Sequence, residues 1–208
     1  MTQTEPVVFV VDDDAAMRRS LAWLLESVSR PVESFNSAEE FLRSYAPDRP
    51  GCLVLDVRMP GMSGLELQNE LARRKSLLPI IIISGHGDVP MAVRAMKAGV
   101  LDFIEKPFNQ QVLLERISDA LKRDARDRKE RQRQDDIQSR LDLLTARERE
   151  VMELVVAGLT SREIAERLGV SPKTVEVHRN HLMDKLKVAG VVELVRLALS
   201  AGPSPAPA

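Results

Sequence analysis

The pattern of apolar and polar positions divides the chain into a part with strands and a part with helices only. In roughly the first 120 residues, short apolar runs alternate with stretches whose apolar residues recur at helical spacing. Uniformly apolar, β-branched runs are typical of parallel strands covered on both faces. The expected strands are 7–11, 32–35, 53–55, 80–83 and 100–104, and the expected helices are 15–28, 38–45, 65–74, 89–98 and 110–121. Five strand–helix units predict an α/β fold with a doubly wound, five-stranded parallel sheet.

A charged run follows this first domain, which we expect at residues 1–121. Twelve of the fifteen positions in 122–136 carry charged side chains of both signs, with no Gly or Pro. Such a run cannot contribute to a core. It predicts a solvated helix that continues from Leu121, with flexible coil as the alternative. We interpret residues 122–140 as an interdomain linker.

From residue 141 the pattern is helical throughout. The expected helices are 146–157, 161–168, 172–187 and 191–199. Two of their starts are marked by capping boxes, because Thr145 and Thr160 each precede a Glu three residues later. Residues 141–200 should form an all-α domain of four helices. The Pro-rich segment 201–208 should be a disordered tail.

Composition narrows the classes of function. Apolar residues make up 44% of the 208 residues, which excludes a wholly disordered chain. Only 3% are aromatic, so we expect aliphatic cores and disfavour readers that stack bases on aromatic rings. The net charge is −1 and no segment is a polybasic arm, so any nucleic-acid site must be local.

The cysteine count and the lengths of the apolar runs indicate the cellular compartment of the protein. The single Cys52 cannot form an internal disulfide, which fits a reducing compartment. No apolar run approaches the ~20 residues that a membrane span needs. The first apolar run has no basic residue before it and stops at three aspartates, so it is not a signal peptide. We expect a cytoplasmic protein with no membrane partner.

Chemically active side chains follow the expected strands. Asp12 and Asp13 follow the first, Asp56 the third, Ser84 the fourth and Lys106 the fifth. Ligands of open α/β sheets bind at the carboxyl ends of strands, and clustered carboxylates favour a shared hard cation such as Mg²⁺. The lysine and the hydroxyl could then bind phosphoryl oxygens, with Asp56 as the nucleophile that forms an aspartyl-phosphate. The alternative is that each acid only caps a helix.

The second domain is predicted to contain a helix-turn-helix, because a short turn joins two of its expected helices. These helices are 160–168 and 171–186. The second of these helices begins with hydrogen-bond donors, where free backbone N–H groups favour a phosphate. Residues near the start of such a helix face base edges in the major groove. The candidates on this helix are Ser171, Lys173, Thr174, Glu176, Val177, Arg179 and Asn180.

The first domain resembles the receiver domain of response regulators, which has a flavodoxin-like fold. The resemblance rests on Val-Asp-Asp-Asp at 11–14, Leu-Asp-Val-Arg-Met-Pro-Gly-Met-Ser-Gly at 55–64, Ile-Ser-Gly-His-Gly-Asp at 83–88 and Lys-Pro-Phe at 106–108. It implies Asp56 as phosphoacceptor, a Mg²⁺ or Mn²⁺ site of Asp12, Asp13, Asp56 and the Arg58 carbonyl, and Ser84, Phe103 and Lys106 as residues that respond to or contact the phosphoryl group. It also implies a cis bond between Lys106 and Pro107.

The second domain resembles the LuxR-type helix-turn-helix. The resemblance rests on 144–150, 164–165, 168–171, 173–175, 178 and 185–186. It implies base contacts by Glu176, Val177 and Asn180, and phosphate contacts by Lys173, Thr174, Arg179 and Lys185. The apolar face of the last helix resembles the dimerisation helix of that family.

The combination resembles the NarL/FixJ class of transcription regulators. It implies a DNA-binding protein, not an enzyme, that a histidine kinase phosphorylates and that dimerises on promoter DNA, with RNA polymerase as a further candidate partner. One rival is a Mg²⁺-dependent phosphohydrolase with Asp12-x-Asp14 as its nucleophile motif, although two alanines follow where Gly and Thr are expected. Another rival is an interaction module whose receiver is never phosphorylated.

Overall fold

The computed structural model describes residues 5–85 and 89–200 of the chain. It contains two compact units, residues 1–128 and 129–208. The segment 201–208, predicted to be a disordered tail, and the last three residues of the 83–88 motif lie outside the described residues.

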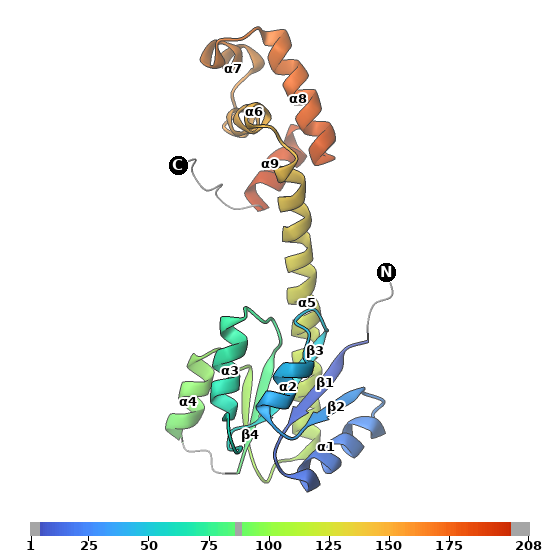
Figure 1. The fold of residues 1–208 in the computed structure, drawn as a ribbon. Coiled ribbons are helices and arrows are strands. Elements are labelled where there is room, and N and C mark those ends of the chain that lie inside the picture. Colours follow the sequence, from blue (N-terminus) through green and yellow to red (C-terminus); the bar gives the residue numbers. More distant parts are fainter. Residues whose placement is uncertain (1–4, 86–88, 201–208) are drawn as a thin grey trace. The chain divides into compact units, whose positions relative to one another are not determined.

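The amino-terminal unit is built on a five-stranded parallel sheet with the strand order β2-β1-β3-β4-β5 (Figure 1). The strands are β1 (Val7–Val11), β2 (Val32–Phe35), β3 (Gly51–Asp56), β4 (Ile80–Ser84) and β5 (Asp102–Glu105). The last strand begins later than expected, because the Val100 N–H bonds to the Ala95 carbonyl and closes the preceding helix. The predicted doubly wound α/β fold is confirmed.

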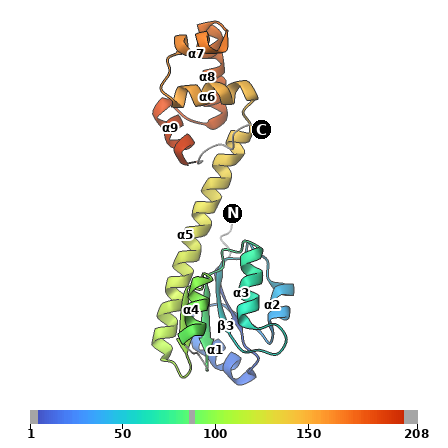
Figure 2. The same ribbon diagram turned by 90° about the vertical axis from the view of Figure 1, so that its left-hand side faces the viewer.

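Helices cover both faces of this sheet (Figure 1, Figure 2). They are α1 (Ala15–Ser27) and α5 (Gln110–Asp142) on one face, and α2 (Ala38–Ser44), α3 (Gly64–Arg73) and α4 (Val89–Lys97) on the other. Strand residues alternate between the faces. In β1, Val8 and Val10 pack in the core under α1 and α5, whereas Phe9 and Val11 pack under α2 and α3.

The cores are mainly aliphatic, as expected, but four aromatic side chains gather in the half under α2 and α3. Phe9, Phe35, Phe41 and Tyr45 form a buried cluster with ring centroids 4.9 to 6.5 Å apart. A low aromatic fraction limits how many rings a chain has but not where they gather. Four of the seven aromatic residues meet here because β1, β2 and α2 are neighbours.

The charged run is helical, since α5 extends without a break from Gln110 to Asp142. Its buried residues fall into two groups. Leu113, Ile117 and Leu121 pack in the core of the amino-terminal unit, whereas Ile137 and Leu141 belong to the core of the carboxyl-terminal unit. Ile137 therefore lies inside the predicted linker 122–140 yet is buried.

Asp124 is the second exception within the charged run. The expectation that residues 122–136 contribute nothing to the interior is wrong for this side chain, which is 1% exposed. Its carboxylate accepts a hydrogen bond from the Gly51 N–H at the start of β3 (2.9 Å) and pairs with Arg128 (2.8 Å). The Arg128 guanidinium also donates to the carbonyls of Pro47 (3.1 Å) and Arg49 (2.7 Å). The first turns beyond Leu121 are therefore bound to the amino-terminal unit.

The carboxyl-terminal unit contains the four predicted helices. They are α6 (Ala146–Val156), α7 (Ser161–Leu168), α8 (Pro172–Leu186) and α9 (Val191–Ser200). Both predicted capping boxes are present, at Thr145 and Thr160. Gly169 ends α7 in the left-handed conformation (φ 64°), which glycine adopts without strain. The buried core joins these helices through aliphatic residues, among them Val151, Ile164, Val175, Leu182 and Leu194.

The Asp124 contacts predict a large loss of stability when they are removed. Asp124→Ala should lower the free energy of unfolding of the amino-terminal unit by roughly 3 kcal/mol, because it leaves a buried N–H and the Arg128 charge without their partner. Asp119→Ala, which removes an exposed pair with Lys122, should change it by less than about 0.5 kcal/mol. Urea denaturation followed by circular dichroism measures both variants. Equal losses for the two would contradict this role of Asp124.

Candidate functional site

The predicted acidic pocket forms at the carboxyl edge of the sheet. Asp12 follows β1, Asp56 is the last residue of β3, Ser84 is the last residue of β4, and Lys106 follows β5. The strands are parallel and in register, with Val11 beside Leu55. Side chains that are far apart along the chain therefore meet at one edge.

Lys106 joins the two buried acids of this pocket. Its Nζ lies 2.9 Å from Asp12 Oδ2 and 3.0 Å from Asp56 Oδ1. Asp12 is 1% exposed and Asp56 is 6% exposed. The remaining carboxylate oxygens accept backbone N–H groups, Asp12 Oδ1 from Asp14 (2.8 Å) and Asp56 Oδ2 from Arg58 (2.9 Å). Each acid is held in a fixed orientation.

The charges of this group do not balance. Burial raises the pKa of Asp12, and this effect outweighs the hydrogen bond from Lys106. Burial alone would lower the pKa of Lys106, but its hydrogen bonds to Asp12 and Asp56 raise it instead. Two carboxylates share one ammonium, so the pocket carries excess negative charge when all three are ionised. Its hard oxygen atoms and this charge fit a small divalent cation such as Mg²⁺.

The backbone around Asp56 leaves no room for larger residues. A Cβ on Gly64 would lie 2.2 Å from the Asp56 carbonyl oxygen, so the start of α3 packs directly against the Asp56 backbone. A capping box of Ser63 and Glu66 fixes this start. On the other side, the Lys106 N–H donates to the Ser84 carbonyl (2.8 Å), and the Lys106–Pro107 bond is cis, as predicted.

The structure does not bring every predicted pocket residue into one cluster. Asp13 is exposed, and in residues 5–85 and 89–200 no three His, Cys, Asp or Glu side chains lie close enough together to hold a metal ion. Asp14, which is not among the predicted pocket acids, caps α1 by accepting the Ala16 N–H. Ser84 is buried, and Phe103 is half-buried against the core under α2 and α3. The predicted functional roles of these residues stay predictions.

Two residues near the pocket escaped the sequence analysis. The Arg18 guanidinium donates to the Asp12 carbonyl (2.7 Å). The Glu39 carboxylate accepts the Met62 N–H (3.0 Å) in the loop that follows Asp56. Neither residue lies in a motif, and only the folded sheet brings their helices to this edge.

In the carboxyl-terminal unit, α7 and α8 form the predicted helix-turn-helix. Val175, Leu182 and Leu186 are buried on α8 against Ile164 and Ala165 of α7. Five of the predicted DNA-binding side chains are exposed: Lys173, Thr174, Glu176, Val177 and Asn180. The start of α8 is capped by the Ser171 hydroxyl, which accepts the Thr174 N–H and bonds to the Thr174 hydroxyl.

The other two predicted DNA-binding residues have partners within the unit. Arg179 is half-buried and donates to the Ser161 hydroxyl (3.1 Å). Lys185 pairs with Glu148 through a 2.6 Å contact, and the Glu148 side chain is 4% exposed. Glu148 also belongs to the capping box of Thr145, so the pair ties α6 to α8. Their phosphate contacts stay predictions, and both side chains have a structural role.

The Glu148 pair predicts a pH-dependent stability. Burial would raise the pKa of Glu148, but hydrogen bonds from Lys185 and Thr145 outweigh it and lower the pKa to about 2. This stabilisation is present above the ordinary pKa of 4.5 and is lost as the pH falls toward 2. Thermal unfolding of the carboxyl-terminal unit, followed by circular dichroism of the whole chain, should show this loss in the wild type.

The variant Glu148→Gln cannot titrate at this position and supplies the comparison. It should be less stable than the wild type at neutral pH, and the difference should shrink between pH 4.5 and about 2. Glu163→Gln, in the exposed capping box of Thr160, serves as the matched control. A stability difference that stays constant over this range would show that the pair does not carry the effect.

Comparison with known proteins gives the family of each unit. Residues 8–118 match the response regulator receiver domain, and residues 142–198 match the luxR family of bacterial regulatory proteins. Nodulation protein W of Bradyrhizobium diazoefficiens is 46% identical over 96% of this chain and 88% of its own length. Transcriptional regulatory protein FixJ of Rhizobium meliloti is 48% identical over 97% of this chain and 99% of its own length.

Solved structures agree with these relatives. The response regulator StyR superimposes with a TM-score of 0.87 at 46% identity and covers 94% of this chain and 98% of its own. Full-length FixJ from B. japonicum superimposes with a TM-score of 0.57 at 44% identity over 96% of this chain and 98% of its own.

A receiver joined to a LuxR-type DNA-binding domain defines a two-component response regulator that controls transcription. Its partners by class are a histidine kinase and DNA, and receivers of this kind generally use Mg²⁺. This chain belongs to the FixJ-like family of these regulators. Among the described residues, no helix has the length and apolar character to cross a bilayer.

Proposed function

We propose that this regulator is switched by phosphorylation of Asp56 and that the switch controls dimerisation and promoter binding. The observation that carries the proposal is the Lys106 ammonium bound to two buried carboxylates at the end of the central strand. The Asp56 carboxylate thus lies beside the Lys106 ammonium, which also holds the Asp12 carboxylate. This arrangement suits phosphoryl transfer, where positioning and charge compensation supply most of the rate.

The chemical step uses the Asp56 carboxylate as nucleophile. One of its oxygens attacks the phosphorus of a kinase phosphohistidine, and the new O–P bond forms as the N–P bond breaks. The histidine nitrogen keeps the bonding electron pair and takes up a proton. Lys106 and the Ser84 hydroxyl would bind phosphoryl oxygens in the product. Asp12, Asp13, Asp56 and the Arg58 carbonyl would hold Mg²⁺, which supplies further charge compensation.

Formation of the phosphoryl group changes which partners Lys106 and Ser84 bind. Phe103 lies on β5 opposite Ile82 of β4 and is half-buried, so its environment can respond to a change at the ends of these two strands. We infer that this response alters the surface of α4 and β5, which is a switch between two local arrangements biased by charge.

The α9 helix is the candidate dimerisation surface. Leu194 is buried in the core of its own unit, whereas Val191 (38%), Val192 (68%) and Leu199 (74%) are exposed. A dimer would place the α8 helices of its two copies on the two half-sites of a paired DNA site. This arrangement compensates for the zero net charge of residues 141–208, because affinity rises with the number of phosphates neutralised.

The phosphohydrolase alternative is disfavoured by the residues that follow its candidate nucleophile motif. Ala15 and Ala16 stand where that motif has Gly and Thr. The carboxyl-terminal unit also matches a DNA-binding domain and not a substrate-binding cap.

The gating proposal predicts a phosphorylation-dependent affinity for DNA. After incubation with Mg²⁺ and a small acyl phosphate, the wild type should dimerise and bind its promoter fragment at least about tenfold more tightly, a difference of ~1.4 kcal/mol. Analytical ultracentrifugation and gel-shift titrations measure the two effects. Asp56→Asn should behave in both assays as the untreated wild type does. A treated Asp56→Asn that gains the same affinity would contradict gating through this residue.

In the helix-turn-helix, loss of a predicted phosphate contact and loss of a predicted base contact should affect DNA binding differently. Lys173→Ala should weaken binding to all DNA sequences and lower the slope of log affinity against log salt by about 1. Asn180→Ala should mainly reduce the preference for the operator, by roughly 1–3 kcal/mol. Lys122→Ala removes an exposed lysine outside this domain and should change neither quantity. A Lys173→Ala salt slope equal to that of Lys122→Ala would contradict the phosphate contact.

A further inference from the structure

We infer that Glu39 is a positioning residue for the metal site, because it holds the loop that carries the Arg58 carbonyl. This inference rests on the proposed function, in which that carbonyl is a ligand of Mg²⁺. Glu39 itself touches neither the phosphoryl group nor the metal in this assignment. It acts through the backbone of residues 57–63.

The loop between β3 and α3 is held near both ends. At its start, the Arg58 N–H donates to Asp56 Oδ2 (2.9 Å). At its end, the Gly64 N–H donates to the Val57 carbonyl (3.0 Å), and Ser63 caps α3. These bonds are local and leave the middle of the loop to be fixed by other contacts.

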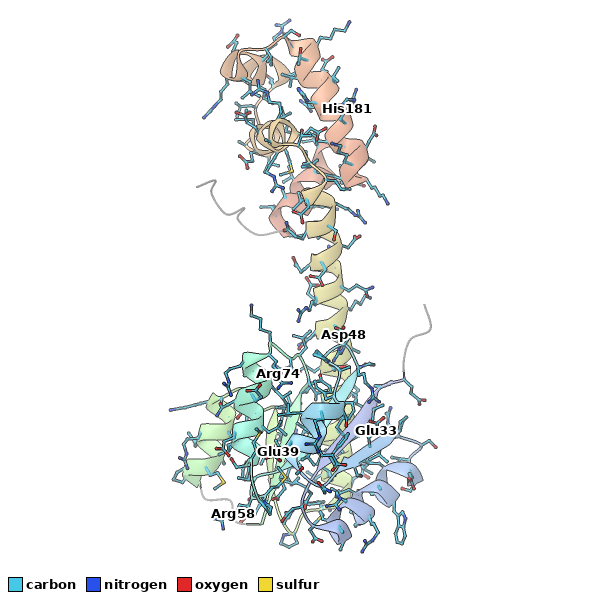
Figure 3. The ribbon with its side chains drawn as sticks, viewed as in Figure 1. Glu33, Glu39, Asp48, Arg58, Arg74 and His181 are labelled. Carbon is cyan, nitrogen blue, oxygen red and sulfur yellow. The ribbon has the colours of Figure 1, made fainter. Side chains whose placement is uncertain are left out.

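Glu39 supplies such a contact from a different element. It lies in the first turn of α2 (Figure 3). Its Oε1 accepts the Met62 N–H at 3.0 Å. The Met62 N–H precedes the capped start of α3. The contact therefore joins the second half of the loop to a helix whose own start is fixed by Ser37.

Gly61 gives independent evidence that the loop passes against this carboxylate. A Cβ on Gly61 would lie 2.9 Å from Glu39 Oε1. The backbone of Gly61 also has φ 78°, a conformation that other residues rarely adopt. Two consecutive residues of the loop are therefore in close contact with one carboxylate oxygen.

The charge state of Glu39 strengthens the contact. Hydrogen bonds from its own backbone N–H and from the Met62 N–H lower the pKa of Glu39. The side chain is then ionised at neutral pH, and charge-assisted hydrogen bonds are stronger than neutral ones. Groups that orient a metal ligand without touching the metal commonly change metal affinity by 10–100-fold.

The test compares three variants of the full chain. Glu39→Ala removes the acceptor, and Glu39→Gln keeps an oxygen acceptor without the charge. Glu40→Ala is the matched control, because Glu40 is the next residue of α2 and its carboxylate accepts the Asn36 N–H (2.8 Å) instead of a loop N–H. Loss of one negative charge near the pocket is therefore common to Glu39→Ala and Glu40→Ala.

Two measurements need no phosphoryl donor. In the metal-free protein, hydrogen exchange at the Met62 amide should be faster in Glu39→Ala than in the wild type and in Glu40→Ala. In calorimetric titrations, Mg²⁺ should bind roughly tenfold more weakly to Glu39→Ala, with Glu39→Gln in between. If Glu39→Ala does not fold, Glu39→Gln provides the test through the same two readouts.

A third measurement separates positioning from general damage. In phosphorylation by a small acyl phosphate, Glu39→Ala should need more Mg²⁺ for half the maximal rate, while the rate at saturating Mg²⁺ stays within about twofold of the wild type. Unchanged Met62 exchange and unchanged Mg²⁺ affinity in Glu39→Ala would overturn the inference. A wild type that binds Mg²⁺ but is never phosphorylated would instead overturn the proposed function.

Discussion

The shared lysine of the receiver pocket is the interaction on which the rest of this structure depends. Lys106 must reach Asp12 and Asp56, which lie 94 and 50 residues away along the chain. Buried carboxylates without a paired cation would be costly, so the three groups require one another. The parallel sheet satisfies this requirement because it ends β1, β3 and β5 at the same edge.

The two units use a buried acid and a lysine in different ways. In the carboxyl-terminal unit, one lysine meets one buried acid, Glu148, and the charges cancel. That pair ties two helices together and leaves no charge for a ligand. In the receiver, one lysine meets two acids, and the uncompensated charge leaves the pocket suited to a cation and a phosphoryl group. The different charge balance distinguishes a structural contact from a candidate reactive site.

Local patterns predicted most of the fold. The β-branched runs predicted β1, β3 and β4, and the capping boxes at Thr145 and Thr160 predicted helix starts that the structure confirms. The pocket could be predicted because each of its main residues directly follows or ends a strand. Such signals are contained in a few adjacent residues, and the sheet geometry converts them into proximity.

The remaining features depend on contacts that no short segment encodes. Asp124 looks like any member of a charged run, yet it accepts the N–H of Gly51, 73 residues away. Glu39 and Met62 meet only when α2 packs beside the loop after β3. The aromatic cluster likewise exists because β1 and β2 are neighbours. Burial of a charged residue is decided by a distant partner, so the sequence pattern alone predicted it to be solvated.

Identification of the phosphorylated residue tests the central claim most directly. The protein is incubated with Mg²⁺ and an acyl phosphate, treated with borohydride, which reduces an aspartyl-phosphate to homoserine, and analysed by peptide mass spectrometry. The account predicts homoserine at position 56 alone, and only when Mg²⁺ and the donor are both present. Homoserine at position 12 or 13, or none at any aspartate, would contradict it.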